Sequence, residues 1–196
     1  MLTQKQIDKL KKNIADAKRS LAAEKRKFGC YDDGRGLRYL PPGLFIQLSD
    51  YSGGMTYLKW FNKNFPDDIG FPIFLFEWTI ILYKCGKIKE AESKALQTYY
   101  SNTYLFDKYL NRPIVPLDKY ESSNWETPLL ASRLPYNCDD EELKDFTAWL
   151  AGFTASERFI EFKQKHTEVN TKLKNETDEE TRHYLVMQNI QLEELI

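Results

Sequence analysis

The sequence predicts an all-helical protein, and three observations support this fold class. Between residues 3 and 28, apolar residues recur at intervals of three and four, which is the period of an amphipathic helix. The same period returns between residues 139 and 196. Between residues 71 and 85 the chain is apolar almost all round, and this run, bounded by Pro72 and Gly86, is too short to span a membrane. It predicts a central helix that is buried on several sides.

Chain length and the order of these patterns predict one core with a helical extension. A chain of 196 residues suits one domain of ordinary size but not two independent domains. Residues 1–110 are expected to form an N-terminal helix followed by two helix pairs. Residues 111–138 contain four prolines and predict an irregular connection. Residues 139–196 predict a C-terminal helical extension that packs on the same domain.

Composition and charge exclude several classes of protein. With 42% apolar residues the chain can bury a core, and its net charge of −1 argues against an overall affinity for nucleic acid or acidic membranes. The N-terminus lacks the apolar stretch of a signal peptide, and no run is long enough to span a bilayer. The three cysteines lie far apart and form no Cys-x-x-Cys pair, which indicates reduced thiols and no structural metal. We expect a cytoplasmic protein without membrane contact.

Glycines and acidic residues cluster after the first predicted helix. Gly29, Gly34 and Gly36 are expected to stop that helix and to allow a turn. Asp32 or Asp33 would cap the next helix, because a carboxylate complements the positive end of a helix. A carboxylate pair also suits acid–base chemistry, but no matching His or Lys partner lies nearby in the sequence. Capping is therefore the preferred interpretation.

A second acidic pair precedes the apolar run. Asp67 and Asp68 follow Pro66 and come before Gly70 and Pro72. Their position resembles that of the first pair, so we expect them to cap the helix that begins there.

Two stretches in the first half of the chain are similar to each other. When residues 48–66 are aligned with residues 85–103, Ser49 falls on Gly86 and Gly54 falls on Ala91, 37 residues apart. This period is the size of a helical repeat. A small residue at such a position lets two helices approach closely, so the spacing indicates packing.

These stretches resemble the tetratricopeptide repeat family. "LSDYSGG" at residues 48–54, with Pro66 twelve residues later, and "YKCGKIKEA" at residues 83–91 match its small-residue, turn and proline positions. The resemblance covers residues 35–103 and implies antiparallel helix pairs. The region from Asp32 to Gly70 is also similar to uncharacterised bacterial proteins described as tetratricopeptide-like, which implies a fold but no activity. The chain departs from the family where Gly54 replaces the usual alanine, and where "LPP" should bend or restart the first helix at Pro41 or Pro42.

Arg38 and Tyr39 are candidate partner-binding residues in the glycine-rich entrance. One interpretation is a charged contact between Arg38 and a partner. The other, which we favour, is a salt bridge from Arg38 to Asp32 or Asp33 within the chain.

Glu77 and Trp78 are further binding candidates within the apolar run. A carboxylate in such a helix must be paired or must reach a groove, so Glu77 is either a structural partner or a recognition residue. A partner peptide would then dock on a concave face. That face would be lined by Tyr39, Phe45, Glu77 and Trp78.

Asn124 and Trp125 stand at the centre of the irregular connection. Trp125 is too large to be exposed without consequence, so it either plugs the core or anchors a partner. The core plug is the preferred interpretation, although loops often carry function.

The two ends of the chain carry opposite charge. Residues 1–28 have nine Lys and Arg against three Asp and Glu, a net charge of +6, whereas residues 176–196 have a net charge of −5. The terminal helices are thus complementary either within one chain or between two copies, and both alternatives stay open. Thr177 and Glu180 stand at capping-box spacing. His166 and His183 have no cysteine beside them, so no metal site is predicted.

No standard catalytic motif occurs in the sequence. A glycine-rich phosphate loop, a nucleophile elbow and a His-Glu-x-x-His motif are all missing, so neither catalysis nor a cofactor is expected. The preferred function is a protein-interaction module or adaptor whose partner is another protein or peptide rather than nucleic acid. One alternative is a small neutralising protein of the immunity or antitoxin kind. The other is an enzyme with an unfamiliar site. That site would be built from Asp32, Asp33, Arg38 and Trp125.

Overall fold

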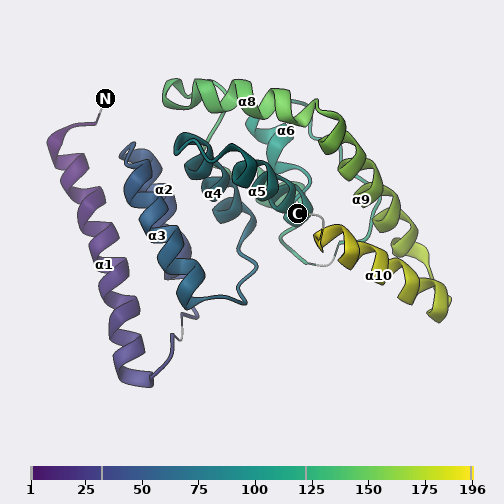
Figure 1. Ribbon diagram of the computed structural model, residues 1–196, viewed down its shortest axis with the longest axis horizontal. Coiled ribbons are helices and arrows are strands. Elements are labelled where there is room, and N and C mark those ends of the chain that lie inside the picture. The colour runs from purple at the N-terminus through teal and green to yellow at the C-terminus, as the bar shows by residue number, and fades with distance from the viewer. Residues whose placement is uncertain (1, 32, 122, 195) are drawn as a thin grey trace. The chain divides into compact units, whose positions relative to one another are not determined.

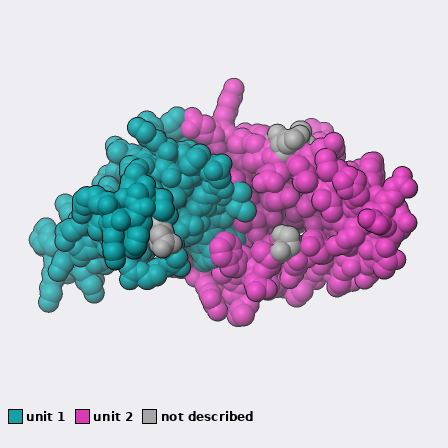
Figure 2. Space-filling model, turned by 90° about the horizontal axis from the view of Figure 1, so that it is seen from below, with its two compact units in different colours: residues 1–87 teal, residues 88–196 magenta. Residues whose placement is uncertain are grey.

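The computed structural model describes residues 2–31, 33–121, 123–194 and 196. These residues form helices, and no strand occurs among them (Figure 1). The predicted all-helical class is therefore confirmed. The chain divides into two compact units, residues 1–87 and residues 88–196 (Figure 2). The division into segments 1–110, 111–138 and 139–196 stays a prediction.

Unit 1 begins with a long amphipathic helix. Its elements are α1 (Gln4–Phe28), the 3-10 helix η1 (Leu37–Tyr39), α2 (Leu40–Gln47), α3 (Tyr51–Asn64) and α4 (Pro72–Lys84). The capping box predicted at the start of α1 is present, because Thr3 and Gln6 exchange backbone and side-chain hydrogen bonds. Helix α1 ends at Gly29, whose φ of 75° lies in the left-handed region. Its buried residues face α2 and η1. They are Ile14, Ala17 and Leu21.

The core of unit 1 lies between α2, α3 and α4, which contact one another. Helix α2 begins with two prolines in its first turn, where a missing N–H costs nothing, so the predicted restart at "LPP" is confirmed. Helix α4 is buried along most of its length, as predicted for the apolar run. The largest fully buried side chains of this core are Tyr57, Leu58, Phe61, Phe74, Leu75, Phe76, Ile80 and Ile81.

The two aligned stretches end their first helix with the same backbone turn. Ser49 after α2 has a φ of 53°, and Gly86 after α4 has a φ of 72°. In both turns the next residue donates a hydrogen bond across five residues, from Asp50 N to Phe45 O and from Lys87 N to Leu82 O, each 3.0 Å long. The alignment made from sequence therefore matches the local geometry.

Gly54 permits the close approach that its alignment predicted. A Cβ atom at this position would lie 2.9 Å from Cδ1 of Ile81 in α4 and 3.3 Å from Cβ of Phe45 in α2. The departure from alanine thus has a physical reason, since the three helices leave too little space for a methyl group.

Unit 2 is organised around one long helix. Its elements are α5 (Ile88–Ser101), α6 (Leu105–Tyr109), α7 (Pro128–Ala131), the 3-10 helix η2 (Glu141–Leu143), α8 (Lys144–Thr154), α9 (Glu157–Asn175) and α10 (Glu179–Glu194). Helix α9 contacts α5, α8 and α10. After residue 176 the chain reverses, and α10 returns along α9 (Figure 1), so that Asn170 donates to Asn189 at 3.2 Å. The predicted apolar stripe of α9 is buried. This stripe consists of Phe159, Phe162, His166, Val169 and Leu173.

The start of α10 differs from its prediction. Asp178 accepts a hydrogen bond of 2.9 Å from the main-chain N–H of Thr181. The predicted capping box of Thr177 and Glu180 is therefore wrong, because the helix begins one residue later and Asp178 takes the capping position.

No helix in the described part of the chain is long and apolar enough to cross a membrane.

The shared backbone turn predicts opposite changes in the free energy of unfolding for substitutions at Ser49 and at Gly86. We expect Ser49→Gly to raise the free energy of unfolding by about 0.5 kcal/mol, because relief of left-handed strain exceeds the added freedom of glycine in the unfolded chain. We expect Gly86→Ala, which has open space around its new Cβ, to lower it by about 1 kcal/mol. Denaturant titration checks both values, and a destabilising Ser49→Gly would contradict the argument.

His166 is a buried histidine with an unsatisfied ring nitrogen. Its Nδ1 atom has no hydrogen-bond partner among the described residues, and its ring packs against those of Tyr99 and Tyr100. Burial, with a smaller effect from the charge of Lys119, lowers the pKa of His166 from 6.5 to about 4. The folded protein therefore holds this ring neutral at pH 7.

Acid should destabilise unit 2 through His166. Below pH 6.5 the unfolded chain binds a proton on this ring, whereas the folded chain does not until about pH 4. The free energy of unfolding therefore decreases as the pH is lowered through this window. The total loss is about 3 kcal/mol. We expect His166→Leu to flatten the unfolding profile between pH 6.5 and 4, relative to the wild type and to the exposed control His183→Gln. Parallel profiles for all three proteins would contradict this assignment.

Candidate functional site

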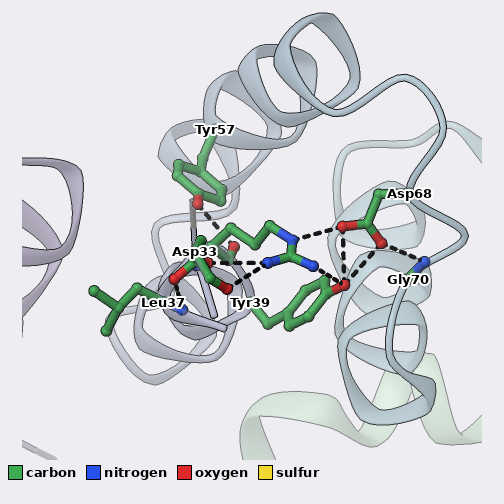
Figure 3. Close-up of polar contacts among 7 residues, drawn as sticks. Asp33, Leu37, Tyr39, Tyr57, Asp68 and Gly70 are labelled. Carbon is green, nitrogen blue, oxygen red and sulfur yellow. Dashed lines mark hydrogen bonds and ion pairs between the residues drawn. The ribbon is translucent and has the colours of Figure 1, made fainter. Parts of the chain in front are cut away.

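A polar cluster in unit 1 collects the candidate residues of the glycine-rich entrance (Figure 3). At its centre, Arg38 Nη1 donates to Asp33 Oδ2 at 3.2 Å, and Arg38 Nε donates to Asp68 Oδ2 at 2.5 Å. Arg38 Nη2 donates to the hydroxyl of Tyr39 at 2.8 Å. Each guanidinium nitrogen thus has a partner inside the protein. We call Asp33, Arg38, Tyr39, Tyr57 and Asp68 the polar cluster.

Asp33 caps the start of the second helical segment. Its two carboxylate oxygens accept the main-chain N–H groups of Leu37 and Arg38, each at 2.8 Å (Figure 3). These are free N–H groups at the start of a helix, which a carboxylate satisfies well. The predicted capping role is therefore present at Asp33. The other candidate of this pair, Asp32, lies outside the described residues.

Asp68 has a different role from the predicted one. Its carboxylate accepts the hydroxyl of Tyr39 at 2.7 Å and the N–H of Gly70 at 2.9 Å (Figure 3). Helix α4 starts after Phe71 and has no side-chain cap. The expected capping of this helix by Asp68 is wrong, because the carboxylate points back to the entrance and Pro72 needs no acceptor.

The pKa shifts of Tyr39 and Arg38 support the hydrogen bonds of the polar cluster. Burial, followed by the hydrogen bond to Asp68, raises the pKa of Tyr39 to about 12. Burial opposes the charge of Arg38, but the hydrogen bonds and charges of its neighbours prevail and raise its pKa. At pH 7 the guanidinium is charged and the phenol keeps the proton that it donates. The cluster acts as a set of fixed hydrogen bonds, and the ion pair of Arg38 with Asp33 that we favoured is present.

The next two candidates, Glu77 and Trp78, lie inside the core. Both side chains are buried in α4, and so is Phe45 in α2. The ring of Trp78 packs edge-on against Phe61 and Phe74, at 5.8 and 5.6 Å between centroids. In this structure these side chains therefore fill the core and do not line an open face.

Asn124 and Trp125 lie on the surface. Trp125 is 45% exposed, so the interpretation of this residue as a core plug is wrong. Its main chain is nevertheless fixed. The side-chain amide of Asn102 donates to the carbonyls of Trp125 and Thr127, at 2.6 and 3.1 Å. Asn102 is itself almost fully buried.

A buried ion pair supports the same part of the connection. Lys119 Nζ lies 3.0 Å from Glu126 Oε2, and the two side chains are 0% and 10% exposed. The main-chain N–H of Tyr120 donates to the carbonyl of Asn170 in α9 at 2.8 Å. Sequence reasoning missed the burial of Lys119, Glu126 and Asn102, because isolated polar residues outside a periodic pattern carry no signal of burial.

A groove lies between α9 and α10, with a volume of about 320 Å³. Its wall mixes an ion pair, Glu168 with Lys172, with the side chains of Gln188 and Leu192. Among the residues that the structure describes, no group of three or more His, Cys, Asp or Glu side chains is placed to hold a metal ion.

The chain matches none of the protein families, curated proteins or solved structures with which it was compared. Function must therefore be argued from the geometry of the site.

The polar cluster predicts a stability defect on removal of one charge. Asp68→Asn replaces an acceptor of three donors by an amide that cannot accept them all, so we expect the free energy of unfolding to fall by about 2 kcal/mol. Asp67→Asn is the matched control, because Asp67 is exposed. Thermal or denaturant unfolding checks both variants, and equal stability of the two would contradict a structural role for Asp68.

Proposed function

We propose that this protein is a protein–protein interaction module of the helical-repeat type. The observation that carries the proposal is an exposed tryptophan on a connection with a fixed main chain. Trp125 is 45% exposed, and Leu129, four residues later, is 66% exposed. We call residues 123–131 the Trp125 segment. Tryptophan is one of the residue types enriched among the anchors of protein interfaces.

Fixing the main chain before binding favours affinity. A loop that orders on binding loses conformational entropy, which opposes association. The Trp125 segment avoids much of this cost, since Asn102 binds its main chain and Glu126, within the segment, forms a buried ion pair with Lys119. The apolar side chains are then presented on a prepared surface.

The similar turns of the two aligned stretches support the same proposal. Helices α2 and α3 are joined by a three-residue turn, and the turns at Ser49 and Gly86 share their backbone hydrogen bonds. Gly54 allows the close helix approach that such repeats use. Helical repeats commonly present binding surfaces, so these local features of unit 1 are consistent with an interaction module.

The remaining features favour binding over catalysis. The carboxylates of Asp33 and Asp68 are engaged by main-chain N–H groups, Arg38 and Tyr39, so the acidic residues serve the fold. The cysteines are free, which supports a reducing cytoplasmic location.

Capture of partners from a lysate of the native host tests this function. We expect the wild type to retain a specific protein that Trp125→Ala loses by about tenfold or more, because an anchor tryptophan carries much of the binding energy. Ile69→Ala is the matched control, since Ile69 is 71% exposed and lies in the other unit. Circular dichroism confirms that each variant is folded.

Two results would contradict the proposed function. One is the absence of any specific partner for the wild type, which would redirect work to metabolite screens. The other is an equal set of partners for the wild type and Trp125→Ala, which would remove the Trp125 segment from the interface.

A further inference from the structure

Helix α10 carries apolar residues on its buried side and on its exposed side. Its inner face packs on α9 through Leu185 and Leu192, which are buried. On the exposed side, Val186, Met187 and Ile190 are 38%, 42% and 43% exposed. These three residues recur at one-, three- and four-residue intervals, so they form one stripe along the helix. We call them the outer face of α10.

Acidic residues flank the outer face. Glu179 and Glu180 precede the stripe, and Glu193 follows it. Within the described part of the chain, no ion pair engages these three carboxylates. Arg182 is the single Lys or Arg among residues 176–196. Its guanidinium is directed at the carbonyls of Leu173 and Glu176, at 3.0 and 3.4 Å.

The outer face is held in place by the contacts of the inner face. The amide of Asn170 bridges to Asn189, and Arg182 ties α10 to the end of α9. A stripe on a helix that is anchored along its other side is prepared for a partner. An apolar stripe with acidic flanks is suited to a complementary helix.

Charge decides which kind of partner fits. A second copy of α10 would place acidic flanks against acidic flanks, which is repulsive. The α1 helix of a second copy is basic, but its apolar residues Ile14, Ala17 and Leu21 are buried in unit 1. Nucleic acid and anionic lipid are disfavoured by the net charge of −5 over residues 176–196. The occupant must therefore bring apolar and basic groups together.

We propose that the outer face of α10 binds a basic amphipathic helix from another protein. The apolar side of that helix covers Val186, Met187 and Ile190, and its Lys or Arg residues reach Glu179, Glu180 and Glu193. Met187 suits this role, because its flexible thioether adapts to different apolar surfaces. This assignment rests on the proposed function as an interaction module, but it uses a different surface from the Trp125 segment.

A synthetic peptide tests the outer face directly. The probe is a peptide of about 16 residues, the length of α10, built from leucine and lysine with leucines at helical spacing. One control peptide has the same composition in strict alternation, and a second has glutamate in place of lysine. Binding to the full chain is measured by fluorescence anisotropy at low and high salt, and helix formation by circular dichroism.

A matched pair of variants distinguishes binding at the outer face from nonspecific attraction of the basic peptide to acidic residues. Ile190 in α10 is 43% exposed and Ile160 in α9 is 41% exposed, so Ile190→Ser and Ile160→Ser remove equal apolar groups. We expect Ile190→Ser to weaken binding of the leucine–lysine peptide by about tenfold, and Ile160→Ser to change it by less than about twofold. We expect the wild type to bind the two control peptides at least about tenfold more weakly.

Each alternative occupant has its own outcome. Equal binding by wild type and Ile190→Ser, or equal binding of the glutamate peptide, would overturn the proposal. Self-association in ultracentrifugation that Ile190→Ser abolishes would assign the face to a second copy instead. Binding to vesicles of anionic lipid that Ile190→Ser abolishes would assign it to a membrane surface.

The result is distinguishable from failure of the proposed function. Loss of partners with Trp125→Ala reports on the Trp125 segment, whereas the peptide reports on α10 alone. A protein that captures a partner through Trp125 but binds no basic helix would keep the proposed function and lose this inference.

Discussion

The guanidinium of Arg38 joins two loops of unit 1, and Asp68 in the second loop lies thirty residues after Arg38 in the chain. The guanidinium binds Asp33 before α2 and Asp68 before α4, and the hydroxyl of Tyr57 donates to the main-chain carbonyl of Arg38 at 2.8 Å. A partly buried ion pair of this kind adds little net stability, but losing one partner leaves a costly unpaired charge. The arrangement of α2, α3 and α4 therefore depends on the cluster being complete, which explains why so many polar residues converge at a helix entrance.

In unit 2 a different set of buried polar side chains binds the irregular connection. This connection has little regular backbone hydrogen bonding, so buried side chains must supply the partners. Asn102 serves the carbonyls of Trp125 and Thr127, and Lys119 pairs with Glu126. These interactions hold a proline-rich stretch in one conformation. As a result, a tryptophan that would normally fill a core is held at the surface.

The two surfaces proposed for binding share one physical property. Each places apolar side chains outward on a backbone that is fixed from behind, by Asn102 at the Trp125 segment and by α9 at α10. Exposed apolar groups on a mobile segment would gain less from burial, because ordering would oppose binding. They differ in charge, since α10 combines its apolar stripe with acidic flanks that form no ion pair within the described part of the chain.

Local interactions are what the sequence by itself determined. Helix periodicity, the cap at Thr3, the restart at Pro41 and the cap at Asp33 depend on residues within a few positions of each other, so their pattern can be read along the chain. Tertiary structure alone decided that Asp68 turns to Arg38, that Glu77 and Trp78 enter the core and that Trp125 stays out. Those outcomes depend on which distant groups compete for burial and for hydrogen bonds, and no local pattern encodes that competition.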